Sequence, residues 1–121
     1  MRRIRNRIGL VRHTLRAAWW TVCALASLRK QFGRVPLHEI RVAAPPPLTP
    51  RAGRGVDAVL RLYSSTCLQR ALVAQRWLKS RGIDRDVVVG VTGSKQFRAH
   101  AWVDGETPPV EFRELTRLRA S

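Results

Sequence analysis

Apolar residues recur at three- and four-residue steps over residues 3–31, which is the spacing of one face of an amphipathic α-helix. The apolar positions are Ile4, Ile8, Val11, Leu15, Ala18, Trp19, Val22, Leu25, Ala26 and Leu28. Gly33 and Pro36 predict the end of this helix, because glycine favours a helix C-cap and proline cannot continue the hydrogen-bond ladder. The proline-rich stretch that follows, as far as Gly55, predicts an extended strap.

Two further helices are predicted in the middle of the chain. The first is short and runs from about Gly55 to Tyr63. The second runs from about Cys67 to Arg81, directly after a Ser-Ser-Thr cluster at 64–66 that supplies N-cap side chains. Gly82 predicts the end of the second helix.

After residue 82 the apolar period becomes extended. We predict strands at 87–91 and 97–103, a hairpin turn at Asp104-Gly105, a third strand at about 109–112 and a short helical tail. The chain of 121 residues is long enough for one modest core. We therefore expect an α+β fold, with a helix and strap at 1–50 for packing or partner docking, and a core at 51–121.

The chain combines 45% hydrophobic residues with a net charge of +15, so it should fold and should attract anions. It has no recognisable nucleic-acid-binding motif, and no specific nucleic acid is expected as a partner. A basic module that coats nucleic acid or anionic membrane remains an alternative. Arginines flank Trp19 and Trp20, which permits peripheral membrane contact through the first helix, although aromatic stripes at helical spacing usually pack in a core.

Two cysteines, Cys23 and Cys67, are too few for a disulfide-stapled secreted fold and fit a reducing cytoplasm. Arginines near the N-terminus resemble a signal peptide, but Arg12 and Arg16 interrupt the apolar stretch. The longest uncharged run, 17–28, is shorter than the roughly 20 residues that span a bilayer. Neither metal-ligand spacing nor a phosphate-binding glycine loop is present, so no metal or cofactor is expected.

Cys67 is the candidate nucleophile, because unpaired amides and the dipole at a helix N-terminus stabilise a thiolate. His100, on a predicted strand after this helix, is the candidate base. A carboxylate should orient the imidazole, and we prefer Glu111 on the returning strand of the hairpin to Asp104 at its tip. A single cysteine on a helix or a single histidine on a strand is more often a buried packing residue than a catalytic one. The spacing of Cys67 and His100 alone therefore does not identify a catalytic pair.

Four segments in this order resemble the leader peptidase of lasso-peptide biosynthesis, a transglutaminase-like family. They read STCLQRAL at 65–72, LKSRG at 78–82, VVGV at 88–91 and FRAHAWV at 97–103. The resemblance implies a papain-like core, with Cys67 and His100 matching the nucleophile and base. The family usually has an aspartate beyond the histidine, and Glu111 is its natural substitute here.

The resemblance also implies partners. The substrate would be a ribosomal precursor peptide, leader plus core, whose leader is removed before a separate ATP-using lasso cyclase closes the macrolactam. The chain resembles the form of the peptidase that lacks a leader-recognition domain, so a separate leader-recognition protein is expected, with Trp19 and Trp20 in its docking surface. An acyltransferase or transglutaminase using the same triad, or an inactive scaffold, are further alternatives. The oxyanion would bind the Cys67 amide and a second donor, for which Gln69 and Ser65 are candidates.

Overall fold

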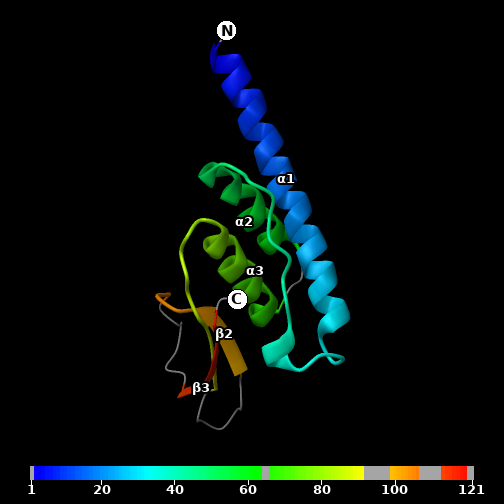
Figure 1. Cartoon of the computed structure of the whole chain (residues 1–121), viewed down its shortest axis with the longest axis vertical. Coiled ribbons are helices and arrows are strands. Elements are labelled where there is room, and N and C mark those ends of the chain that lie inside the picture. The colour runs from blue at the N-terminus through cyan, green and yellow to red at the C-terminus, as the bar shows by residue number, and fades with distance from the viewer. Residues whose placement is uncertain (1, 64–65, 92–98, 107–112, 120–121) are drawn as a thin grey trace.

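The computed structural model describes residues 2–63, 66–91, 99–106 and 113–119, and for residues 2–8 and 10 it describes the backbone alone. Three α-helices pack against a three-stranded antiparallel sheet in this part of the chain, so the α+β prediction is confirmed. Figure 1 shows the long first helix along one side of the molecule, with the other two helices between it and the sheet.

Helix α1 spans Arg2–Gln31, in agreement with the apolar period of the sequence. Gly33 follows with φ of 84°, a conformation that suits glycine at the end of a helix. The strap then contains two 3-10 turns, η1 (Leu37–Glu39) and η2 (Pro50–Ala52). Gln31 fixes the strap to the helix, because its side chain donates to the Arg41 carbonyl at 2.8 Å and accepts from the Arg41 amide at 2.9 Å.

Helix α2 spans Gly53–Leu62, slightly earlier than predicted, and packs across α1. Gly55 is buried at the crossing point. A Cβ atom on Gly55 would lie 2.2 Å from the main-chain oxygen of Thr14 and 3.0 Å from the amide nitrogen of Ala18. The two helix backbones therefore approach closely because this position lacks a side chain.

Helix α3 spans Cys67–Ser80, one residue shorter than predicted. Thr66 begins it with a capping box: its hydroxyl accepts from the Gln69 amide at 3.2 Å, and its own amide donates to the Gln69 side chain at 3.0 Å. Gly82, with φ of 78°, follows the end of the helix, as its sequence position indicated. Local chemistry thus fixes both ends of α3.

The sheet consists of β1 (Val87–Val91), β2 (Ala99–Val103) and β3 (Arg113–Leu118), in the order β2-β1-β3. Both outer strands are antiparallel to β1. The observed range of β1 is the range predicted from the sequence. β1 is the most apolar strand, and its central place buries it on both sides.

One sequence prediction about the C-terminal part, the helical tail, is wrong. Asp104 and Gly105 do form a turn, in which the Glu106 amide bonds to the Val103 carbonyl at 3.1 Å, but β3 pairs with β1 and not with β2. Residues 113–118 form a strand where a helical tail was expected. The third strand predicted at 109–112 lies outside the described residues. The Asp-Gly pair specifies only a local reversal of the chain. The pairing of β3 with β1 depends instead on covering the apolar strand β1.

One hydrophobic cluster connects both predicted segments of the chain. Its buried members from the helices and strap are Ala17, Trp20, Ala24, Leu25, Leu28, Ile40, Ala52, Val56, Val59, Ala71, Leu72, Val73 and Trp77, and those from the sheet are Val87, Ala101 and Val103. Trp20 of α1 contacts Trp77 of α3, with ring centroids 6.0 Å apart and planes tilted by 40°. The division at residue 50 stays a prediction, although the core crosses it.

Candidate active site

Cys67 is the first residue of α3, half-buried and present as a free thiol. The capping box of Thr66 and Gln69 holds the first turn of the helix around it. Helix N-termini direct backbone amides outward and carry the positive end of the dipole, so this position suits a thiolate and a developing oxyanion. Gln69, a candidate second oxyanion donor, uses its side-chain oxygen in the capping box. Ser65, the other candidate, lies outside the described residues.

His100 is the second residue of β2 and is aligned with Gly90 of β1. It is half-buried, and its ring stacks on Trp102, with centroids 5.9 Å apart and planes 22° apart. Ala101 and Val103 alternate with these two residues and are buried in the core that includes α3. His100 and Trp102 therefore share the face of β2 opposite to that core.

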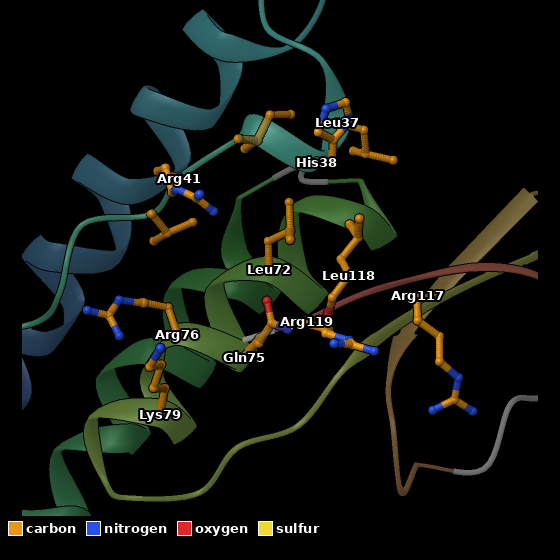
Figure 2. Close-up of a pocket in the computed structure, with 12 residues that line it drawn as sticks. Leu37, His38, Arg41, Leu72, Gln75, Arg76, Lys79, Arg117, Leu118 and Arg119 are labelled. Atoms are coloured by element: carbon orange, nitrogen blue, oxygen red, sulfur yellow. Dashed lines mark hydrogen bonds between the residues drawn. The ribbon is translucent and has the colours of Figure 1, made fainter. Parts of the chain in front are cut away.

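The packing of α3 on the sheet sets the relative position of Cys67 and His100. Gln75 of α3 bonds to the main-chain oxygen of Leu118, and Leu118 is aligned with Val87, which in turn faces Val103. The C-terminal half of α3 hence lies at the end of the sheet where β2 finishes (Figure 2).

Cys67, at the other end of α3, is consequently directed toward the end of the sheet where β2 begins. Cys67 begins α3, His100 is the second residue of β2, and these two elements pack against each other. The His100 ring lies on the outer face of β2, stacked on Trp102. β2 is an edge strand of the described sheet. Its outer edge is therefore the border between the face that carries His100 and the face that packs against α3.

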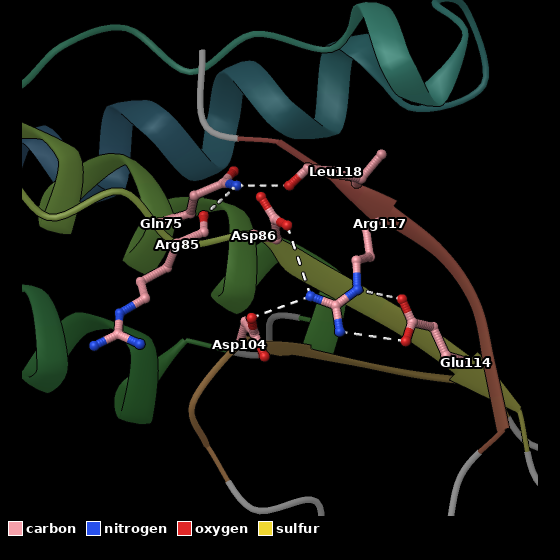
Figure 3. Close-up of polar contacts among 7 residues, drawn as sticks. All are labelled: Gln75, Arg85, Asp86, Asp104, Glu114, Arg117 and Leu118. Atoms are coloured by element: carbon pink, nitrogen blue, oxygen red, sulfur yellow. Dashed lines mark hydrogen bonds and ion pairs between the residues drawn. The ribbon is translucent and has the colours of Figure 1, made fainter.

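Asp104, the second choice for the acid, belongs to an ionic cluster at the opposite end of β2 from His100 (Figure 3). Arg117 donates to Asp104 at 3.0 Å and to Glu114, and lies 3.6 Å from Asp86. The hydrogen bonds that Arg117 donates, first to the Glu114 carboxylate and second to that of Asp104, raise the pKa of its guanidinium above its ordinary value. The cluster joins β3 to the turn after β2 across the central strand.

Glu111, the preferred acid, lies outside the described residues. Glu111 was expected near His100 because the returning strand at 109–112 was predicted to pair with β2, and that strand also lies outside the described residues. The described strand β3 pairs with β1. The resemblance to the peptidase family remains as its support.

Glu114 is a carboxylate that sequence reasoning missed. Glu114 of β3 is aligned with Gly90 of β1, and His100 of β2 is aligned with the same glycine from the other edge of β1. Glu114 and His100 therefore lie on the same face of the sheet, with Gly90 between them. Residues 113–118 had been predicted as a helical tail, which hid this alignment. Its carboxylate is bonded to Arg117.

The two tryptophans of α1 differ in environment. Trp20 is 8% exposed and donates from Nε1 to the Ala43 carbonyl at 3.1 Å, so it belongs to the core. Trp19 is 69% exposed. It continues an exposed apolar stripe with Val11 and Leu15, and of the two tryptophans predicted to dock a partner only Trp19 is available.

Within the described part of the chain, no group of three or more histidine, cysteine, aspartate or glutamate residues is arranged to hold a metal ion. None of the described helices is both long and apolar enough to span a membrane.

A family model described as the transglutaminase-like superfamily matches residues 7–119. The match includes Cys67, His100 and most of α1. Comparisons with curated proteins and with solved structures gave no significant match.

Proposed function

Because the chain belongs to the transglutaminase-like superfamily, we propose that it is a cysteine peptidase in which Cys67 is the nucleophile and His100 the base. The observation that carries this proposal is the position of Cys67, a free thiol at the first residue of a capped helix within the matched region. The resemblance of residues 65–72 and 97–103 to the lasso-peptide leader peptidase supports a finer assignment. We assign the protein to removal of the leader from a ribosomal precursor, before a separate cyclase closes the macrolactam.

The reaction would begin with attack of the Cys67 thiolate on the scissile carbonyl. The backbone amide of Cys67, at the start of α3, would stabilise the oxyanion of the tetrahedral intermediate together with a second donor. His100 would then protonate the departing amine, which leaves an acyl-enzyme, and would activate the water that releases the acid.

The proposed dyad places the His100 imidazole against the Cys67 thiol. In the substrate-free structure the His100 ring stacks on Trp102. We expect the contact with Cys67 to tighten when substrate binds, as catalytic contacts often do. Two substrate-free measurements are expected to reflect this: slow alkylation of Cys67 and contact between the His100 ring and Trp102 in nuclear Overhauser spectra.

The acid of the triad is the least constrained residue, and we keep Glu111 as its first candidate. Glu114 is the described alternative, because only Gly90 separates its position from that of His100 in the register. The variants Glu111→Gln and Glu114→Gln separate the two, since both remove one carboxylate charge and keep the side-chain size. The variant with the lower kcat identifies the acid, provided that the unfolding midpoint is unchanged.

We assign the stripe of Val11, Leu15 and Trp19 to contact with the separate leader-recognition protein. Arg12 and Arg16 line the same apolar groove, which favours a partner surface that surrounds an apolar patch with carboxylates. Trp19→Ala should weaken co-purification with that protein and leave the fold intact. Binding of α1 to anionic vesicles in place of the protein partner would overturn the assignment.

A second candidate function follows from the superfamily itself. An acyl-thioester on Cys67 can react with an amine as well as with water, which would make the protein an acyltransferase. Adding a primary amine to the cleavage reaction distinguishes the two, because an amide product would appear at the expense of the free acid.

The decisive experiment is mass spectrometry of the precursor peptide encoded beside this gene, incubated with its leader-recognition protein. Wild-type protein and Cys23→Ala should release the leader, and Cys67→Ala should not. Cys23→Ala is a matched control because Cys23 is the second free thiol and is exposed on α1. Equal cleavage by Cys67→Ala, or no cleavage by any of the three proteins, would overturn the proposal and favour the basic binding module.

A further inference from the structure

A pocket of about 300 Å³ lies between η1, the C-terminal half of α3 and the end of β3 (Figure 2). Five of its lining residues are arginine or lysine: Arg41, Arg76, Lys79, Arg117 and Arg119. None of the described residues that line it is an aspartate or glutamate. The other lining residues are His38 and Gln75 and the aliphatic residues Leu37, Ile40, Val42, Leu72 and Leu118, so the pocket is both cationic and partly apolar.

The charges in this pocket are unevenly balanced. Arg117 is neutralised by Asp86, Asp104 and Glu114. For the other four cations, the ion pairs found among the described residues include no partner. Like charges in one hollow repel one another, and the repulsion is relieved when an anion enters.

The scaffold fixes the main chain that carries these cations before any ligand arrives. Arg76 and Lys79 are half-buried and lie on successive turns of α3. The Arg41 backbone is fixed from both sides by Gln31, and the Leu118 carbonyl, next to Arg119, is fixed by Gln75. A preorganised site loses less conformational entropy on binding than a set of free surface side chains.

We propose that this pocket binds acidic side chains of the peptide substrate, an inference that rests on the proposed function. Guanidinium groups bind carboxylates in bidentate geometry, and the apolar wall suits a carboxylate residue next to an aliphatic one. The pocket is a bounded hollow and not a long basic track, which favours a few peptide side chains over a nucleic-acid backbone.

The location of the pocket gives the spacing of the acidic residue from the cleaved bond. Arg76 and Lys79 follow Cys67 by nine and twelve residues on one helix, which corresponds to about 14 and 18 Å along its axis. An extended peptide needs at least roughly four to six residues to cover this distance, because Arg76 is turned about halfway around the helix from Cys67. The pocket would thus hold the substrate several residues away from the scissile bond, where binding energy can orient the reacting carbonyl.

Binding can be measured without catalysis by fluorescence anisotropy on a Cys67→Ala background. The probe is a short peptide with two adjacent glutamates between leucines and an uncharged dye, and its counterpart carries glutamines in their place. We expect the glutamate peptide to bind about tenfold more tightly. Equal affinity of the two peptides would overturn the proposal.

Two double variants localise the site. Arg76→Gln with Lys79→Gln removes two charges from the pocket, and Arg54→Gln with Arg61→Gln removes two from α2. The pocket pair should weaken glutamate-peptide binding about tenfold, and the control pair by less than about twofold. Equal losses would indicate diffuse attraction and would overturn the proposal, provided that both variants unfold at the same temperature as their parent.

Competition experiments separate the sources of the anion. Millimolar inorganic phosphate should displace the glutamate peptide only weakly. A short single-stranded RNA that binds more tightly than the peptide, and loses that affinity in the pocket pair alone, would show a nucleic-acid site and overturn the proposal.

A wrong assignment of the pocket and a wrong assignment of the peptidase activity give different results in these experiments. If wild-type protein cleaves the precursor but the pocket pair binds and cleaves normally, the peptidase assignment stands and the pocket assignment is wrong. If no protein cleaves but the pocket pair alone loses peptide binding, the pocket is supported as a peptide site and the peptidase assignment is wrong.

Discussion

Gln75 donates from Nε2 to the main-chain oxygen of Leu118 at 2.8 Å, so that the third turn of α3 is bonded to the end of β3, far along the chain. The same nitrogen donates to the Arg85 carbonyl at 2.8 Å. Both amide hydrogens are thus used on the main chain of the sheet and of the segment that enters it. This contact sets how α3 lies on the sheet, and hence at which end of the sheet Cys67 is found.

Replacing Gln75 with leucine should therefore destabilise the fold strongly. Gln75 is only 7% exposed, so the two carbonyls lose their partners in a place that water reaches poorly. We expect a loss of about 2–3 kcal/mol in the free energy of unfolding, measured by urea titration. Gln31→Leu is the control, because its bonds to Arg41 are exposed, and should cost less than about 1 kcal/mol. Similar losses for both variants would contradict this account of Gln75.

The crossing of α1 and α2 gives a second prediction with a built-in control. Gly55→Ala would place a methyl group 2.2 Å from the Thr14 carbonyl oxygen, which is main chain and cannot rotate away. The two helices would have to separate, and we expect a loss of about 3 kcal/mol or more.

Gly9→Ala makes the same chemical change in α1, where no atom lies within 4 Å of the added methyl group. Alanine favours helix over glycine, so Gly9→Ala should stabilise the protein by up to about 1 kcal/mol. Thermal unfolding of both variants followed by circular dichroism tests the pair. A neutral Gly55→Ala would mean that the helices do not cross at this distance.

The neighbouring tryptophans of α1 should respond differently to one substitution. Trp20→Phe loses the hydrogen bond to Ala43 and part of the contact with Trp77, and should cost about 1–2 kcal/mol. Trp19→Phe changes an exposed side chain and should alter stability by less than about 0.5 kcal/mol. Loss of Trp20 should also weaken the bluer component of the fluorescence emission, of which the equally buried Trp77 keeps a part. A larger effect at Trp19 would reverse the assignment of the two faces.

Sequence patterns predicted the elements whose ends depend on local chemistry. Thr66 and Gly82 mark the two ends of α3 because capping and left-handed glycine act within a few residues. β1 was predicted at its observed range because it is a continuous apolar run. The position of Cys67 at the start of α3 was therefore predictable from the sequence alone.

Features that depend on contacts across the fold were not predictable in the same way. The helical period included Trp19 and not Trp20, whereas Trp20 is the tryptophan that meets Trp77. Asp104-Gly105 predicted a hairpin, yet β3 passes to the far side of β1. The alignment of Glu114 with Gly90 follows from that pairing and from an irregular register after Val89, neither of which leaves a local signal.

The capping box beside Cys67 gives the last prediction. In Thr66→Ala the Gln69 amide loses its acceptor and the first turn of α3 frays, which should cost about 1 kcal/mol. Thr66→Ser keeps the hydroxyl and should stay within a few tenths of a kcal/mol of wild type. Hydrogen exchange of the Gln69 amide is the direct measurement, since it should accelerate in Thr66→Ala and not in Thr66→Ser. Unchanged exchange in Thr66→Ala would mean that the hydroxyl does not hold the turn that carries the Cys67 thiol. If the turn does fray, leader cleavage should slow as well, because the thiolate and the oxyanion depend on the same ordered amides.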